Sequence, residues 1–260
     1  MAIITLTTDW RNDDFYKGSV TGAILSGCND ARIVDITHQV SPFSSTQAAF
    51  ILKNVFSHYP KGSVHILDVN SEASEQHKHI AFKYRDHYFV GTDNGSFGLL
   101  LIDDNPEEAV IIEKFVPDTC FTFPALYVFA PTAAYLASGK SLNELGSPLS
   151  GLNKQMPLLA SINDSVIAGS VIYIDSYQNA ITNISGELFE KIGKGRPFEI
   201  LVQSYHYKIN RINTTYNETS DGELLAIFNS VGLLEIAINR GNVAELLNIG
   251  LHSNVRVKFH

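Results

Sequence analysis

Short apolar runs and helical patterns alternate over the first half of this 260-residue chain. β-Branched runs at 3–8, 30–37 and 63–69 predict buried strands, and amphipathic spacing predicts helices at 16–25 and 44–56. Further elements are expected as a hairpin over 80–91, a helix that ends at 101, a strand at 109–112 and a helix over 127–137. Because strands and helices alternate, we predict an α/β fold, an α/β sandwich, for this part of the chain.

The pattern changes near residue 147, where Ser, Pro, Gly and Asn become frequent and helical spacing largely stops. Short strands separated by turns are predicted beyond this point, at 165–174, 180–184, 198–202, 206–212, 224–228, 233–238 and 254–259. Many short strands with turn residues between them are typical of a small β-barrel or a sandwich. We therefore predict an N-terminal α/β domain over 1–150, a linker over 151–164 and a C-terminal small β-barrel domain over 165–260.

The composition excludes several classes of function. The formal net charge is −8 and no basic run occurs, so nucleic acid is not an expected partner. No apolar run approaches the roughly 18 residues that a membrane span needs, and the first residues do not resemble a signal peptide. Two cysteines, Cys28 and Cys120, are too few for a metal site or a disulfide framework. We expect a cytoplasmic protein without a metal ion and without a membrane partner.

Asp9 stands at the end of the first predicted strand, where ligands bind in open α/β sheets. Three interpretations of its carboxylate are open: a cap of the following helix, a ligand of a hard cation, or an acceptor for the two hydroxyls of a ribose. Asn70 and Asn94 follow later predicted strands in the same way and are further candidates for a site. Glycine-rich motifs for dinucleotides or phosphates and the GxSxG nucleophile motif do not occur.

The C-terminal part of the chain has polar turns of its own. Such residues are common in turns for backbone reasons. An aromatic ring beside amides is also what stacking on a purine and binding its edge requires, so both interpretations stay open from the residues alone. The candidates in these turns are Asp175, Tyr177, Asn179, Ser230 and Asn239.

Six short motifs occur in an order that is specific for one family. They are Thr8-Asp9-Trp10 with Asp14 and Tyr16, Val34-Asp35-Ile36-Thr37-His38, Val90-Gly91-Thr92-Asp93-Asn94-Gly95, Phe129-Ala130-Pro131, Ile174-Asp175 with Asn179, and Asn229-Ser230 with Gly232. On these residues the chain resembles the S-adenosylmethionine hydrolase and halogenase family, the S-adenosylmethionine hydroxide adenosyltransferases related to fluorinase. The resemblance covers nearly the whole length of the chain.

The resemblance implies that S-adenosylmethionine or adenosine is the ligand and that no cofactor is needed. It implies attack of water or hydroxide at C5′, which gives adenosine and L-methionine. It also implies a homotrimer whose sites lie between one subunit's first domain and its neighbour's second. Carried over, the roles are the ribose hydroxyls for Asp9, a flanking ring for Phe43, the methionine amino group for Asp175, stacking on adenine for Tyr177, the adenine edge for Asn179 and the methionine carboxylate for Ser230.

Three positions depart from the pattern of the hydrolases. Asn70, His77 and Pro124 stand where an aspartate, an arginine and a histidine are expected to orient the water. Asn70 cannot act as a base, and Pro124 has no side-chain hydrogen bond to offer. Halogenation is not favoured, because Ala73 and Ala125 lack the hydroxyls of a halide pocket.

Two interpretations of the catalysis follow. In the first, the chain is a hydrolase with a rebuilt water site, and His77 and Asn70 are the candidate catalytic residues. Glu72, Glu75 or Asp68 are further polar groups that this site could use. In the second, the chain is a noncatalytic homologue that keeps a pocket for S-adenosylmethionine or adenosine. Both interpretations keep the same class of ligand.

Overall fold

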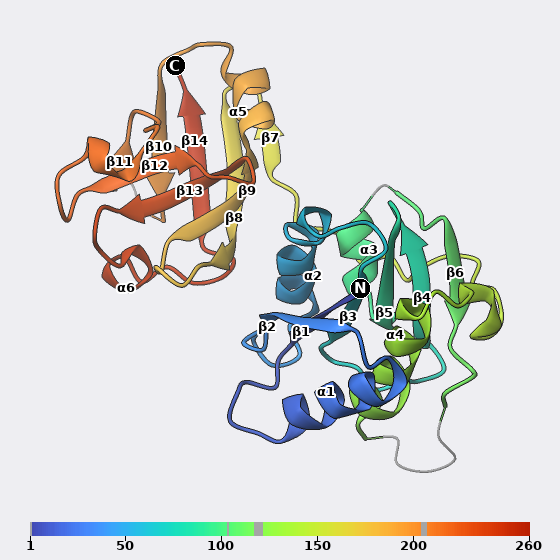
Figure 1. Cartoon of the computed structure of the whole chain (residues 1–260). Helices are drawn as coiled ribbons and strands as arrows, with labels where there is room; N and C mark the ends of the chain where they lie inside the picture. Colours follow the sequence, from blue (N-terminus) through green and yellow to red (C-terminus); the bar gives the residue numbers. More distant parts are fainter. Residues whose placement is uncertain (1, 103, 117–121, 204–206) are drawn as a thin grey trace. The chain divides into compact units, whose positions relative to one another are not determined.

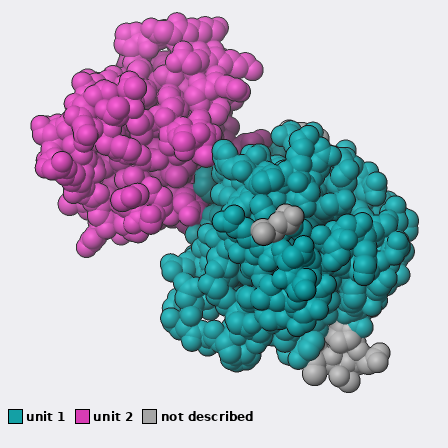
Figure 2. Space-filling model, viewed as in Figure 1, with its two compact units in different colours: residues 1–157 teal, residues 158–260 magenta. Residues whose placement is uncertain are grey.

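The computed structural model describes residues 2–102, 104–116, 122–203 and 207–260. The chain forms two compact units, unit 1 with residues 1–157 and unit 2 with residues 158–260, which Figure 2 shows in different colours. The segment interpreted as a linker is divided between them, because 151–157 belong to unit 1 and a short strand follows in unit 2. No helix in the described ranges is long and apolar enough to cross a membrane.

Unit 1 is built on a six-stranded sheet with the order β2-β1-β3-β5-β4-β6 (Figure 1). The strands are β1 (Ile3–Thr8), β2 (Arg32–Thr37), β3 (Val64–Asp68), β4 (His79–Tyr84), β5 (His87–Thr92) and β6 (Glu108–Ile111). β2, β1, β3 and β5 run parallel, whereas β4 and β6 pair antiparallel. The four parallel strands therefore bring their carboxyl ends to one edge of the sheet, where ligands bind in such folds.

Helices cover both faces of this sheet (Figure 1). Successive side chains of a strand point to opposite faces. Ile4 and Ile66 pack on one face with α1 (Tyr16–Gly27) and α4 (Ala130–Ala137). Leu67 and Phe89 pack on the other face with α2 (Ser45–Lys53) and α3 (Ser96–Leu101). The predicted α/β fold is confirmed.

The helix expected over 16–25 extends to Gly27, and two other helices of unit 1 also differ from the prediction at their ends. The helix expected over 44–56 ends at Lys53, and a 3-10 turn follows at Phe56–His58. Its N-cap is confirmed, because the Ser44 side chain accepts a hydrogen bond from the Gln47 N–H. The helix expected over 127–137 starts earlier, since a π-helical segment, Ala125–Phe129, runs directly into α4. A 3-10 turn at Leu142–Glu144 precedes the end of the unit.

Unit 2 is a nearly closed, barrel-like sheet of eight strands (Figure 1). Its order is β11-β10-β14-β8-β9-β13-β12, and β7 pairs with β8. A bridge between Asn213 and Ile227 connects the segment after β11 to β12, which brings the two ends of this order together. The predicted small β-barrel is confirmed. The strands are β7 (Ser161–Asn163), β8 (Val166–Ile174), β9 (Ala180–Ser185), β10 (Phe198–Val202), β11 (Lys208–Ile209), β12 (Leu224–Phe228), β13 (Leu233–Ile238) and β14 (Asn254–Phe259).

Two short helices of unit 2 are missing from the sequence-based prediction. They are α5 (Gly186–Gly193) and α6 (Val243–Leu246). Ser185 caps α5 by accepting a hydrogen bond from the Leu188 N–H at 3.1 Å, and Phe189 packs into the barrel core. The strand expected over 206–212 is reduced to β11, and its first residue lies outside the described residues. A 3-10 turn at Tyr216–Glu218 follows it.

Candidate functional site

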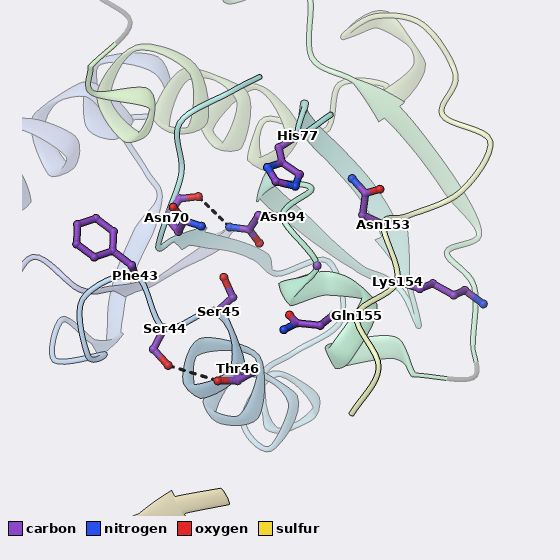
Figure 3. Close-up of a pocket in the computed structure, with 11 residues that line it drawn as sticks. Phe43, Ser44, Ser45, Thr46, Asn70, His77, Asn94, Asn153, Lys154 and Gln155 are labelled. Carbon is purple, nitrogen blue, oxygen red and sulfur yellow. Dashed lines mark hydrogen bonds between the residues drawn. The ribbon is translucent and has the colours of Figure 1, made fainter. Parts of the chain in front are cut away.

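A pocket of about 540 Å³ opens in unit 1 where the loops after β2, β3 and β5 meet segment 153–155 (Figure 3). Hydroxyls, amides and an imidazole make up most of its wall, so the pocket suits a ligand with many hydrogen-bonding groups. The Lys154 side chain points away from the other lining residues in Figure 3. The lining residues are Phe43, Ser44, Ser45, Thr46, Asn70, His77, Asn94, Gly95, Asn153, Lys154 and Gln155.

Asp9 accepts a hydrogen bond from Phe43, a residue that lines this pocket. The Phe43 N–H donates a hydrogen bond to Asp9 Oδ2 at 2.9 Å, and the Phe43 ring is 73% exposed. Phe43 has a φ of 64°, in the left-handed region that bulky residues seldom adopt, and this hydrogen bond helps to hold it there. The interpretation of Asp9 as a cap of α1 is wrong, because the N-cap of α1 is Phe15 and no side chain caps it.

The loop after β3 is fixed to the sheet at its first residues. Asn94 Nδ2 donates to the carbonyl oxygens of Val69 and Asn70, both at 2.9 Å, while its Oδ1 accepts from Ser96. The carbonyl of Ser71 accepts a further hydrogen bond from Thr92 Oγ1 at 2.7 Å. Asn94 therefore positions the loop, and its direct contact with a ligand stays a prediction. The loop brings Asn70 and His77 to the same pocket.

The loop and segment 153–155 meet at Asp93. The Asp93 carboxylate is buried and accepts hydrogen bonds from the Asn153 N–H at 2.9 and 3.0 Å. Burial raises the pKa of Asp93, while the Asn153 N–H and nearby His77 lower it. Asn153 Nδ2 also donates to the Gln76 carbonyl at 2.9 Å. Asn153 and Gln155 therefore line the pocket, although their segment has the composition of a linker and carries no motif.

Asp68 is a buried carboxylate at the end of β3. The Trp10 indole Nε1–H donates to Asp68 Oδ2 at 2.6 Å. Burial and, to a smaller extent, the charge of Asp9 raise the pKa of Asp68 to about 6, against the opposing effects of Ser71 and Trp10. Glu72 and Glu75, the alternatives suggested with Asp68, are exposed. Within the described ranges, no three His, Cys, Asp or Glu side chains come together as a metal-ion group.

Pro124 has a structural role in this chain. It is buried and has helical dihedral angles at the start of the π-helical segment, a position that suits proline because the first N–H of a helix has no partner. Its neighbour Phe123 packs edge-on against Trp10 and Tyr16, with ring centroids 5.7 and 5.0 Å apart. Pro124 therefore starts a helical segment directly after an aromatic cluster.

The turn between β8 and β9 brings three predicted site residues of unit 2 together. Asp175 Oδ1 accepts hydrogen bonds from the backbone N–H groups of Tyr177 at 2.9 Å and Asn179 at 2.8 Å. The Asn179 side chain lies 3.3 Å from Asp175 Oδ2. These contacts are the turn chemistry that the residue types suggested. The Tyr177 side chain is 79% exposed and is available for stacking.

Ser230 and Asn239 lie at opposite ends of β13. Ser230 is exposed in the turn after β12, where Asn229 Oδ1 accepts from the N–H groups of Val231 and Leu233 at 3.2 Å. Asn239 is buried, and its Nδ2 donates to the Thr219 carbonyl at 2.7 Å. Asn239 thus fixes the backbone at Thr219, before β12. Its contact with a ligand stays a prediction.

Sequence comparison shows a match to two domains of one family. The profile of the SAM hydroxide adenosyltransferase N-terminal domain matches residues 4–146. The profile of the SAM hydroxide adenosyltransferase C-terminal domain matches residues 169–256.

Individual proteins are similar over the whole chain. An (R)-S-adenosyl-L-methionine hydrolase from Thermus thermophilus is 28% identical, with 96% of each chain covered. A protein of the same name from Salinispora tropica is 28% identical, over 98% of this chain and 97% of its own. A fluorinase from an Actinoplanes species is 22% identical, over 95% of this chain and 94% of its own.

A solved structure has the same fold. The crystal structure of an uncharacterized conserved protein from Thermotoga maritima superposes with a TM-score of 0.87 at 27% identity, over 99% of this chain and 100% of that chain. Its match includes the elements that carry the pocket and the β8–β9 turn, because it covers nearly all of both units. With both domain profiles matched in order, the chain belongs to the SAM hydroxide adenosyltransferase family.

Proposed function

We propose that the protein binds S-adenosylmethionine and hydrolyses it to adenosine and L-methionine. The contact between Asp9 and Phe43 carries this proposal, because it holds a strand-end carboxylate and an exposed aromatic ring together at the pocket. A carboxylate accepts both hydroxyls of a ribose, and a ring packs against the flat parts of a nucleoside. The relatives named (R)-S-adenosyl-L-methionine hydrolase support the same substrate here.

The reaction depends more on positioning the water at C5′ than on transferring a proton to the leaving group. Water attacks C5′ of the ribose, the C5′–O bond forms as the C5′–S bond breaks, and methionine leaves as a neutral thioether. The attacking oxygen then loses a proton. In this proposal Asn70 orients the water through its amide, and His77 accepts the proton, because both line the pocket and imidazole is a base near neutral pH.

We assign the adenine and methionine ends of the ligand to residues of unit 2. Tyr177 stacks on adenine and Asn179 binds its edge, while Asp175 and Ser230 hold the amino and carboxylate groups of methionine. The exposure of Tyr177 and Ser230 supports these roles. In the same proposal the protein is a homotrimer, and each site combines unit 1 of one subunit with unit 2 of its neighbour. A trimer mass in light scattering is expected, and a monomer mass would remove this composite site.

The test is a long incubation of the purified protein with S-adenosylmethionine at high enzyme concentration, followed by chromatography. Adenosine and methionine should appear in equal amounts above the buffer blank. The Asp9→Ala protein should form neither. Wild-type protein that forms no adenosine under these conditions would sink the hydrolase proposal.

A noncatalytic protein that binds S-adenosylmethionine or adenosine is the second candidate. Two positions favour it: Asn70 cannot act as a base, and Pro124 is committed to the start of a helical segment. Calorimetry separates the candidates. Binding without adenosine formation would establish the second one, and no binding of either ligand would overturn both.

A further inference from the structure

Asp68 adds a second carboxylate beside Asp9. In the parallel pair of β1 and β3, Asp68 is in register with Thr8, the residue directly before Asp9. The Asp68 side chain is 4% exposed, and the charge of Asp9 raises its pKa beyond the larger effect of burial. The two carboxylates are therefore close enough to repel each other across a site that water only partly screens.

Among the described residues, only neutral groups donate hydrogen bonds to these two carboxylates. They are the Trp10 indole, which binds Asp68 Oδ2 at 2.6 Å, and the Phe43 N–H, which binds Asp9 Oδ2 at 2.9 Å. Asp68 Oδ1 has no partner in hydrogen-bond geometry, although the Ser71 hydroxyl is close enough to lower the pKa of Asp68. No described residue of unit 1 therefore compensates a buried charge at Asp68.

Neither cationic side chain of the β1–α1 segment binds this pair, because Arg11 is exposed with no ion pair to Asp9 or Asp68 and Lys17 is paired with Asp35. Lys17 of α1 forms an ion pair with Asp35 Oδ2 at 2.5 Å. His38 stacks on Trp10 at 5.8 Å, is bonded to Thr8 at 2.8 Å, and has its Nε2 3.1 Å from Asp35 Oδ1. Asp68 and Asp9 thus leave an excess of negative charge at the carboxyl edge of the sheet, and a positively charged ligand relieves it.

We propose that Asp68 is a specificity-determining residue, whose charge acts with that of Asp9 to favour a sulfonium ligand over a neutral ligand of the same shape. This inference rests on the proposed function, because it requires the ribose of S-adenosylmethionine to lie at Asp9. The positive sulfur of that ligand is bonded to C5′ of the same ribose. S-Adenosylhomocysteine, the neutral thioether, and adenosine lack this charge.

The proposed preference makes the site bind substrate more tightly than the nucleoside product. Both carboxylates attract the positively charged substrate, whereas the nucleoside product, which is neutral, keeps only its hydrogen bonds to Asp9. Asp68 acts through space, since Coulomb attraction falls off slowly in a partly buried site. It therefore favours release of adenosine over release of unreacted substrate.

The single tryptophan of the chain, Trp10, provides the measurement. Its indole N–H is bonded to Asp68, so its fluorescence follows both ligand binding and the ionisation of Asp68. Stopped-flow titration gives the dissociation constants of S-adenosylmethionine before turnover and of S-adenosylhomocysteine and adenosine. In mildly alkaline buffer, wild-type protein should bind the sulfonium ligand about tenfold more tightly than the thioether. This preference should shrink as the pH falls through about 6, because protonated Asp68 carries no charge.

Asp68→Asn is the matched variant, because it removes the charge and keeps an oxygen that accepts from Trp10. It should lower the preference for the sulfonium ligand by about tenfold, abolish its pH dependence and leave the affinity for adenosine unchanged. Asp13→Asn removes the same charge from an exposed position in the β1–α1 loop and should keep the full preference. His38 and the pocket residue His77 are present in all three proteins, so the difference between their profiles reports Asp68.

Two results would overturn the inference: a wild-type preference that does not change with pH, or a full preference in Asp68→Asn. The wild-type titration needs no variant, so the test survives if Asp68→Asn folds poorly. Adenosine formation without any charge preference would leave the proposed function standing and remove this inference alone. If none of the three ligands binds, the proposed function itself fails.

Discussion

Nε2 of His65 lies 3.1 Å from Nδ1 of His87 in the interior of unit 1. Thr5 Oγ1 is 2.8 Å from the Nδ1 atom of His65, so both nitrogens of this ring have partners. Burial, and to a smaller extent the neighbouring His87, lowers the pKa of His65 to about 3, and burial also lowers the pKa of His87. Thr5, His65 and His87 belong to β1, β3 and β5, so a neutral imidazole pair connects three adjacent strands.

Because the pKa of His65 is lowered in the folded protein, we predict that His65 makes the protein less stable in acid. Folded His65 stays neutral down to about pH 3, whereas the unfolded chain takes up a proton near pH 6.5. Between these values His65 makes the unfolded chain bind more protons, so the contribution of His65 to the free energy of unfolding falls by about 1.4 kcal/mol for each pH unit of acidification. Asp68, whose folded pKa is raised to about 6, contributes in the opposite sense below that pH. Urea unfolding at a series of pH values measures this slope.

Two variants assign the slope. His65→Asn should remove the His65 contribution to the slope between pH 6.5 and about 3, because the residue that titrates is gone. His58→Asn, at an exposed position of the 3-10 turn after α2, should keep the wild-type slope. The effect of Asp68 is the same in all three proteins. Equal slopes in wild type and His65→Asn would contradict the assignment.

Asp9→Ala should weaken adenosine binding far more than Asp14→Ala. Only Asp9 is bonded to Phe43 at the pocket, whereas Asp14 is an exposed carboxylate of the same loop. Loss of two charge-assisted hydrogen bonds to a ribose corresponds to an affinity loss of at least tenfold. Calorimetry measures both variants, and equal losses would show that Asp9 does not hold the ribose.

Gly98→Ala should displace segment 153–155, which lines the pocket. A Cβ atom at Gly98 would lie 2.4 Å from the Asn153 carbonyl oxygen, so segment 153–155 has to move. Overpacking of this kind costs about 1–3 kcal/mol, and we expect both a lower free energy of unfolding and several-fold weaker ligand binding. Denaturant unfolding and calorimetry measure the two effects.

Gly18→Ala is the control for this change. A Cβ atom at Gly18, within α1, meets nothing within 4 Å, so the substitution should leave ligand binding unchanged. It should also stabilise the protein by roughly 0.5–1 kcal/mol, because alanine loses less backbone entropy in a helix. Unchanged ligand binding in Gly98→Ala would show that segment 153–155 does not shape the site.

Asn70→Asp should raise the rate of adenosine formation. Asn70 has a φ of 50°, in a region where aspartate as well as asparagine is enriched, so the loop should keep its shape. The new carboxylate would supply a base at the pocket wall, an effect of at least about a hundredfold when the geometry is right. Asn12→Asp, at an exposed position, is the control for the added charge. A rate that falls in Asn70→Asp would show that the water site is built around the amide.

Local patterns predicted many of the elements of this fold. β10, β12, β13 and β14 have the predicted bounds, because each is a short apolar run between turn residues. α5 was missed, since its eight residues begin and end with glycine and follow a strand directly. Its cap at Ser185 and the burial of Phe189 against the barrel stabilise a helix too short to be stable alone.

The candidate site was predicted in part. Groups of residues close in the sequence could be predicted, whereas pairs far apart in the sequence could not. Asp175, Tyr177 and Asn179 meet within one turn, so their grouping depends on local backbone geometry and is visible in the sequence. Asp9 and Phe43 are 34 positions apart, and the Asn153 contact with Asp93 spans 60. No local pattern encodes such pairs. Asp9 and Phe43 meet because β1 and β2 end at one edge of the sheet, and Asn153 meets Asp93 because segment 153–155 packs against the end of β5.

The sequence by itself determined the family, the two kinds of domain and the residue types at Asn70, His77 and Pro124, because each of these is written in residue types and their order. Only the tertiary structure decided which polar groups are buried, since burial depends on what the rest of the chain packs against them. The structure shows that Asp68, one of several polar residues considered from the sequence, is buried near Asp9 and accepts a hydrogen bond from Trp10. The charge of the site therefore follows from packing, which no stretch of sequence contains.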